Sequence, residues 1–257
     1  MFNMISAELY KLRKSKSFWI MLAVVVGFSG FMSVIFGVMP AEDLMGLRPE
    51  SASEMLIGAL PSNIQPIIFV LVVFVVLLVN TDFDSGTHRN PLAVGVTRLE
   101  YFIAKFVAVV IACAVFVVAA VMTTGLVYLA FEPWGDMFNF GNFIASIGVG
   151  YLILLAQGTL FMAVALITRK LGATLGIVFG YLVLDMIVGT FIVMMEETSD
   201  VVRMLANILP GPAAYYLTGL ATGIADTGKV IMVIVVSVVM IIVLSVVSVR
   251  SLVKRDV

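Results

Sequence analysis

The sequence has one cysteine, one histidine and few charged residues. The lone Cys113 excludes an internal disulfide and a thiolate zinc site, because both need several cysteines. His88 alone cannot supply the ligand set of a metal hydrolase, nor a Ser/His dyad within an apolar segment. The formal net charge is −1. A concentrated basic surface is therefore not expected, and nucleic acid is not expected as a partner.

Catalytic and nucleotide-binding motifs are also absent from the sequence. It has no G-x-x-x-x-G-K-[ST] phosphate loop, so the chain does not bind ATP in that manner. Neither the H-E-x-x-H motif of zinc proteases nor the G-x-S-x-G motif of serine hydrolases occurs. We therefore expect neither an enzymatic activity nor a cofactor of the chain's own.

Apolar residues dominate what is present. Of the 257 residues, 62% are hydrophobic and 12% are charged, and the mean hydropathy is +1.16. A soluble domain has about half apolar and about a quarter charged residues. A soluble fold of this composition would expose large apolar patches to water. The composition therefore indicates a protein that lies in lipid.

Six apolar stretches approach or exceed the length that a membrane-spanning helix needs, which is about 20 residues. They are residues 18–39, 64–80, 106–131, 142–168, 171–195 and 230–249. We expect the second and shortest stretch to be extended at one end or tilted. In lipid every backbone N–H and C=O must be paired within the segment, so these runs predict helices. The fold class predicted is all-α, with six transmembrane helices.

Basic residues are distributed unevenly between the two sides of this arrangement. Twelve of the 15 Lys and Arg residues lie before the first span, after the last span or in the second and fourth connections. The other side carries Arg48, Arg203, Lys229 and most of the acidic residues. Because loops rich in Lys and Arg stay in the cytoplasm, the distribution predicts an N-in/C-in topology.

The first 17 residues combine apolar and basic side chains. Phe2, Ile5, Leu9 and Leu12 recur at helical spacing, and the basic residues point elsewhere. The pattern favours an amphipathic helix in the membrane interface; a positively charged flank without that role is the alternative. The apolar run at 18–39 is longer than the roughly 7–15 residues of a signal peptide, so we expect a retained helix.

The last outer connection contains an apolar segment, 205–224, that is interrupted by Pro and Gly. It is too short and too broken to cross the membrane. A re-entrant or surface-lying hairpin is the favoured interpretation, because non-helical backbone at membrane depth must be covered by protein or water. An ordinary loop with two interfacial tyrosines remains the alternative.

Asp185 is the ionisable residue that lies deep within a predicted span. Charged groups at membrane depth are costly and mark functional sites by default. Asp185 could line a substrate path, pair across a dimer axis, or be protonated against a hydroxyl such as that of Thr190. A purely structural hydrogen bond is the remaining alternative.

The second connection, residues 82–103, has a pattern of its own. Asp82 and Asp84 precede Ser85 and Thr87, an arrangement typical of a helix start. Apolar residues interrupted by Gly95 follow. We predict a short helix at the cytoplasmic face that presents a surface to a soluble partner; a solvated turn is the alternative.

This connection resembles the signature region of ABC-2 type permeases, the membrane subunits of bacterial ATP-binding-cassette exporters. Asp82-Phe83 stands where that family commonly has Glu-Tyr. The residues that match the pattern as they stand are Gly86, Thr87, Arg89, Asn90, Leu92, Arg98 and Lys105. Residues 7–19 and the ending 254–257 are also similar to the family. The chain most resembles small permeases of antimicrobial-peptide export and immunity systems.

The resemblance implies a type V exporter-like fold and a separate ATPase subunit that hydrolyses ATP. Residues 1–17 would be the connecting helix, and 82–103 would hold the coupling helix that docks into a cytoplasmic ATPase subunit, which binds ATP and Mg²⁺. The coupling residues implied are Asp82, Gly86, Thr87, Arg89, Leu92, Arg98 and Lys105. The substrate would be hydrophobic or amphipathic, such as a peptide, a lipid-like molecule or a drug, exported across the bacterial cytoplasmic membrane.

A second permease subunit, identical or a paralogue, is also implied, with contacts through the first and fifth helices. Gly172, Gly176 and Gly180 lie on one face of the fifth span, at a spacing that permits close helix approach. Packing of this face within one subunit is the alternative. Two other functions remain open: an ion- or proton-coupled secondary transporter, which the absence of an inverted repeat weakens, and a membrane scaffold or sensor subunit.

Overall fold

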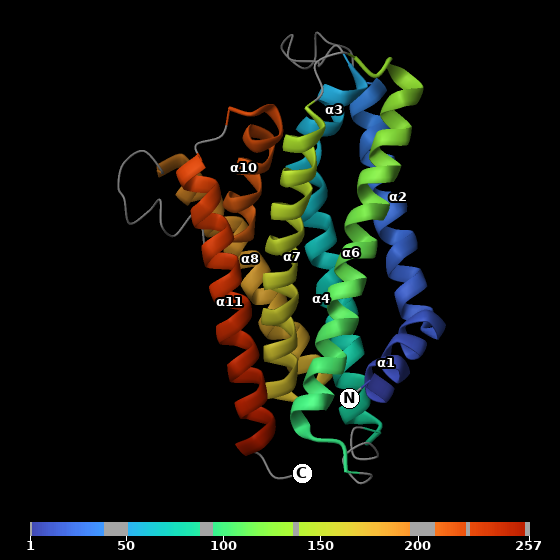
Figure 1. Cartoon of the computed structure of the whole chain (residues 1–257), viewed down its shortest axis with the longest axis vertical. Coiled ribbons are helices and arrows are strands. Elements are labelled where there is room, and N and C mark those ends of the chain that lie inside the picture. Colours follow the sequence, from blue (N-terminus) through green and yellow to red (C-terminus); the bar gives the residue numbers. More distant parts are fainter. Residues whose placement is uncertain are drawn as a thin grey trace.

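The computed structural model describes residues 2–38, 51–87, 95–135, 139–195, 209–224 and 227–254. These residues form nine helices and no strand. The helices are α1 (Phe2–Lys14), α2 (Lys16–Val38), α3 (Ala52–Gly58), α4 (Leu60–Asp84), α6 (Arg98–Phe131), α7 (Phe140–Thr168), α8 (Leu171–Met195), α10 (Pro210–Thr222) and α11 (Thr227–Lys254) (Figure 1).

Six of these helices, α2, α4, α6, α7, α8 and α11, are long and apolar enough to cross a membrane. The predicted all-α class with six candidate transmembrane helices is confirmed. Helix α4 runs four residues beyond the predicted span at each end. Its first turn contains Pro61, which fits there because the N–H groups of a first turn have no helical partner.

Helix α6 begins at Arg98, eight residues before its predicted apolar span. Thr97 and Glu100 form a capping box: the Glu100 N–H donates to the Thr97 hydroxyl (3.2 Å), and the Thr97 N–H donates to the Glu100 carboxylate (3.0 Å). With 34 residues, α6 is about 50 Å long, which exceeds the thickness of the hydrocarbon core. Its first turns therefore extend from the membrane into the second connection.

Helix α7 is the centre of the bundle. It packs against α4, α6, α8, α10 and α11, and it is the most buried of the spanning helices. On the other side of α6, α2 packs against α6 and α4. The rings of Phe18, Phe74 and Phe116 join α2, α4 and α6, with centroids 5.7–5.9 Å apart. Both chain termini lie at one end of the bundle (Figure 1), which we call the terminus end; the opposite end is the far end.

The described part of the apolar segment 205–224 is one helix, α10, and residues 205–208 lie outside the described residues. The backbone of 210–222 is therefore helical, and the re-entrant or surface-lying hairpin over 205–224 stays a prediction, because the residues before Leu209 lie outside the described part. Pro210 and Pro212 are in the first turn of α10, where proline does not interrupt helical hydrogen bonds. The helix begins beside Gly189 in the interior of α8 and ends near Asn142 at the start of α7, so it rises along the bundle toward the far end.

Candidate functional site

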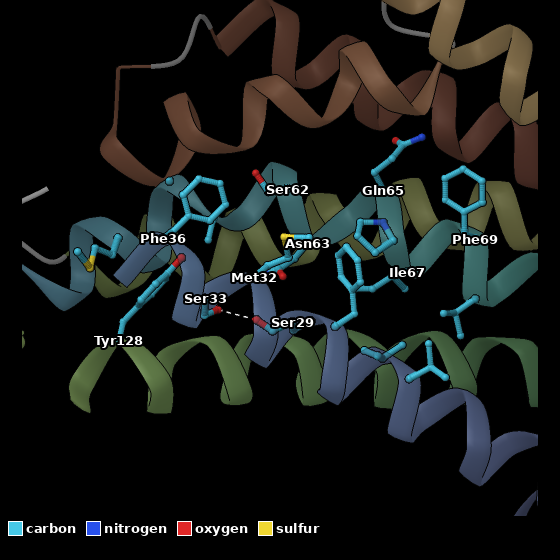
Figure 2. A pocket seen from close by; sticks show the side chains of 18 residues that line it. Ser29, Met32, Ser33, Phe36, Ser62, Asn63, Gln65, Ile67, Phe69 and Tyr128 are labelled. Carbon is cyan, nitrogen blue, oxygen red and sulfur yellow. Dashed lines mark hydrogen bonds between the residues drawn. The ribbon is translucent and has the colours of Figure 1, made fainter. Parts of the chain in front are cut away.

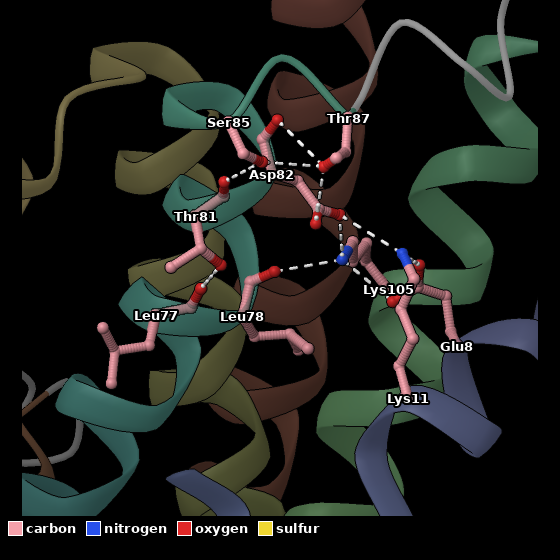
Figure 3. Close-up of polar contacts among 9 residues, drawn as sticks. All are labelled: Glu8, Lys11, Leu77, Leu78, Thr81, Asp82, Ser85, Thr87 and Lys105. Atoms are coloured by element: carbon pink, nitrogen blue, oxygen red, sulfur yellow. Dashed lines mark hydrogen bonds and ion pairs between the residues drawn. The ribbon is translucent and has the colours of Figure 1, made fainter. Parts of the chain in front are cut away.

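Helix α1 directs one carboxylate into the protein. Glu8 is fully buried, on the same face as the buried Leu12 one turn later. Its Oε2 atom lies 2.8 Å from the Nζ atom of Lys105 in α6, an ion pair without the angle of a hydrogen bond. Lys105 itself is 1% exposed. An acid and a base that are distant in sequence therefore pair inside the terminus end (Figure 3).

Two further charges complete the cluster. Asp82, in the last turn of α4, places Oδ2 at 2.6 Å from Lys105 Nζ and 3.8 Å from Lys11 Nζ. Lys11 Nζ donates to Glu8 Oε1 at 2.9 Å. Lys105 Nζ also donates to the carbonyl of Leu78 at 3.0 Å. We call Glu8, Lys11, Asp82 and Lys105 the ion cluster; it is neutral in total and joins α1, α4 and α6 (Figure 3).

Burial makes the ion cluster sensitive to the loss of any one member. Charges taken out of water are tolerated when they are paired and hydrogen-bonded, and removal of one partner leaves an uncompensated buried charge. Burial lowers the pKa of Lys11, but the hydrogen bond and charge of Glu8, together with Asp82, outweigh it and raise the pKa above its ordinary value. Lys11 therefore remains a cation at physiological pH and balances the second carboxylate.

Helix α4 ends two residues after Asp82, at Asp84. Gly86 has a φ of +69° and its N–H donates to the carbonyl of Phe83, which is a glycine helix ending. The hydroxyl of Thr87 donates to Asp82 Oδ1 at 3.2 Å. Residues 85–87 therefore form the turn that closes α4, and the short helix predicted to start there stays a prediction, because residues 88–94 lie outside the described part. A side chain at Gly86 would meet no atom within 4 Å among the described residues, so the backbone angle, and not a close approach, requires glycine.

The implied coupling residues fall into separate places. Gly86 and Thr87 lie in the turn after α4, and Asp82 and Lys105 belong to the ion cluster. The Arg98 guanidinium donates to the carbonyl of Val253 at 2.6 Å and so ties the start of α6 to the last turn of α11. Arg89 and Leu92 lie outside the described residues. The structure therefore places Asp82, Arg98 and Lys105 where they hold the two ends of the 82–103 segment on the bundle.

Sequence reasoning did not identify Glu8 and Lys11 as members of the site. Glu8 is the acidic residue of the first 17, and it falls on the apolar face with Ile5 and Leu12. A charge on the apolar face of an amphipathic helix indicates a buried partner, so a signal was present. The identity of that partner could not be read from the sequence.

Asp185 is 2% exposed and lies near the first turn of α10. A Cβ atom built on Gly211 would be 3.4 Å from Asp185 Oδ2, and the Gln65 side chain of α4 also approaches the carboxylate. Neither carboxylate oxygen makes a hydrogen bond of good geometry with any described group. The side chain of Thr190 lies outside the described residues, so the suggested pairing with its hydroxyl stays a hypothesis.

Gly172, Gly176 and Gly180 are exposed on α8. A Cβ atom at any of them would meet nothing within 4 Å among the described residues. Packing of this glycine face within one subunit, the alternative considered from the sequence, is therefore not observed in the described part of the chain. The face is open to lipid or to another protein.

A groove of about 790 Å³ lies between α2 and α4, toward the far end (Figure 2). Phe28, Phe36 and Phe69 contribute aromatic surface, and Tyr128 of α6 closes one end. The volume is within the range of small-molecule sites, which are mostly apolar with a few polar groups. Within the part of the chain that the structure describes, no three His, Cys, Asp or Glu residues gather closely enough to hold a metal ion.

Comparison with known proteins agrees with this architecture. A search of curated proteins gives no match. The sequence model of a family described as ABC-2 family transporter protein matches residues 4–185. The match begins in α1, includes every member of the ion cluster and ends at Asp185 in α8. Because it covers more than half of the chain, the protein belongs to the ABC-2 family of transporter proteins.

Proposed function

We propose that this membrane subunit of an ABC transporter exports a hydrophobic or amphipathic substrate, driven by ATP that a separate cytoplasmic ATPase subunit hydrolyses. The ion cluster is the observation that carries the proposal. Asp82 and Lys105 bracket the 82–103 segment, and both pair within a cluster that Glu8 and Lys11 of α1 complete. A partner that moves this segment therefore acts on α1, α4 and α6 together.

The ATPase would act through this connection. Docking of 82–103 to the ATPase would transmit a nucleotide-dependent movement to α4 and α6, which extend from the terminus end to the far end. ATP can shift the equilibrium between inward and outward arrangements only if the contacts differ between the two states. The paired charges at the terminus end of α4 and α6 would hold these two helices together during that movement.

A second permease subunit would complete the transporter, as a homodimer or as a heterodimer with a paralogue. The exposed glycine face of α8 supports this, because small residues permit close helix approach in lipid. The apolar groove supports a substrate such as a peptide, a lipid-like molecule or a drug. Export would take place across the bacterial cytoplasmic membrane, with surrounding lipid in contact with the exposed apolar faces.

Reconstitution tests this function. The chain is co-expressed with an ABC ATPase subunit from the same genome, purified and placed in proteoliposomes with a fluorescent amphiphile. We expect co-purification, stimulated ATP hydrolysis and ATP-dependent movement of the amphiphile. Movement driven by a proton or sodium gradient without ATP would instead show a secondary transporter. Association with the ATPase but no movement under any condition would show a scaffold or sensor.

Labelling of introduced cysteines tests the N-in/C-in orientation. Ile224 is 84% exposed beyond α10, and Ser85 is exposed at the end of α4. In intact cells a membrane-impermeant maleimide is expected to label Ile224→Cys and to leave Ser85→Cys unlabelled. Native Cys113 is buried and gives a low background. Labelling of Ser85→Cys with protection of Ile224→Cys would show that the orientation is the opposite one. Asn139→Cys at the far end provides an independent test.

A further inference from the structure

The groove between α2 and α4 is mostly apolar, with a few polar side chains in its wall. Toward the far end it is lined by Ser33, Ser62, Asn63 and Tyr128 together with Phe36 and Met55. The half nearer the centre of the bundle is lined by Val24, Val25, Phe28, Phe69 and Val70. An occupant with a large apolar part matches this lining.

Gln65 connects the groove to Asp185. Gln65 lines the groove, yet its side chain points away from α2 (Figure 2). It approaches the carboxylate of Asp185, which lies in the part of α8 closer to the far end. The buried carboxylate therefore lies close to a half-buried side chain of the groove wall.

The start of α10 does not satisfy this carboxylate. Pro210 and Pro212 have no N–H, and the N–H of Ala213 donates to the carbonyl of Leu209. In this turn only Gly211 retains an N–H for Asp185. An ionised carboxylate can accept about four hydrogen bonds. Asp185 therefore has acceptor capacity that none of the described groups fills with good geometry.

We propose that the groove binds an amphiphile that carries a positively charged group. Its apolar part lies between α2 and α4, and its cation pairs with Asp185 once Gln65 has turned aside. A cationic group supplies the hydrogen-bond donors and the opposite charge that a buried carboxylate needs. The inference rests on the proposed function in one respect, that this amphiphile is the exported substrate.

Photolabelling tests the site without the ATPase. Three probes share one alkyl chain with a diazirine and end in an ammonium, a hydroxyl or a sulfonate group. The full chain is labelled in nanodiscs of phosphatidylcholine, and labelled peptides are identified by mass spectrometry. We expect the ammonium probe to label groove peptides at a half-saturating concentration about tenfold below that of the hydroxyl probe. The sulfonate probe should label most weakly.

Matched variants locate the charge and the groove. Asp185→Asn should remove the preference for ammonium and leave labelling by the hydroxyl probe unchanged, which also shows that the variant is folded. Asp84→Asn, which removes one exposed charge at the terminus end, should keep the preference. Ser62→Trp, at an exposed groove position, should reduce labelling by all three probes.

Three results would overturn the inference: equal half-saturation by the ammonium and hydroxyl probes, an unchanged preference in Asp185→Asn, or unchanged labelling in Ser62→Trp. Because no ATPase or nucleotide is present, these results concern the binding site alone. Absence of ATP-driven movement in the proteoliposome experiment would contradict the proposed function and leave the binding result intact.

Discussion

Lys105→Met is expected to reduce the free energy that holds α1 on the bundle by about 3–5 kcal/mol. This is the usual cost of removing one partner from a buried ion pair. Glu8 is fully buried and Asp82 is mostly shielded, and both lose the cation that they share. Methionine fills a similar volume, so packing changes little. Amide hydrogen exchange of α1 in the purified protein should accelerate by a factor of roughly a few hundred to a few thousand.

A second substitution separates charge from shape. In Glu8→Gln/Lys105→Met, Asp82 and Lys11 remain as one balanced pair, so part of the lost protection should return. Lys170→Met removes an exposed cation between α7 and α8 and should change stability by less than about 0.5 kcal/mol. If Lys105→Met behaves like Lys170→Met, the ion cluster contributes nothing to the attachment of α1.

The long apolar runs made the spanning helices predictable, because lipid allows few alternatives for an uninterrupted apolar segment. Helix α8 has the predicted bounds, since Arg169 and Lys170 precede it. The ends of α4 and α6 were harder to predict, because they continue into polar sequence. The start of α6 could have been found from Thr97 and Glu100, whose spacing is that of a capping box.

The pairing of charges in the ion cluster could not be predicted from the sequence. The family resemblance implies a coupling role for Lys105, yet its side chain points inward to Glu8, 97 residues earlier in the chain. Which acid meets which base depends on how α1 lies on α6, and helical spacing within one segment carries no information about that. The helical backbone of 210–222 is hard to predict for a different reason. Pro210 and Pro212 occupy a first turn, where proline does not break a helix.

The turn after α4 is where we expect the largest effect on function. Gly86→Val places a β-branched residue at a φ of +69°, which costs about 1–3 kcal/mol in backbone strain. No neighbouring described atom obstructs the new side chain, so the strain changes the direction in which the chain leaves α4. The protein should reach the membrane at normal levels. Association with the ATPase should weaken, and substrate-stimulated ATP hydrolysis should be lost.

Graded variants distinguish backbone geometry from the mere addition of a side chain. Gly86→Asn should retain coupling, because asparagine tolerates the left-handed region. Gly148→Val adds the same valine at an exposed helical position of α7, with open space around it, and should behave like the wild type. Arg98→Lys keeps the charge but loses the planar group that reaches the carbonyl of Val253, so coupling should weaken while membrane levels stay normal. If Gly86→Val and Arg98→Lys both retain the ATPase and its stimulation, the 82–103 segment is only a connecting loop, and the ATPase must act on another part of the chain.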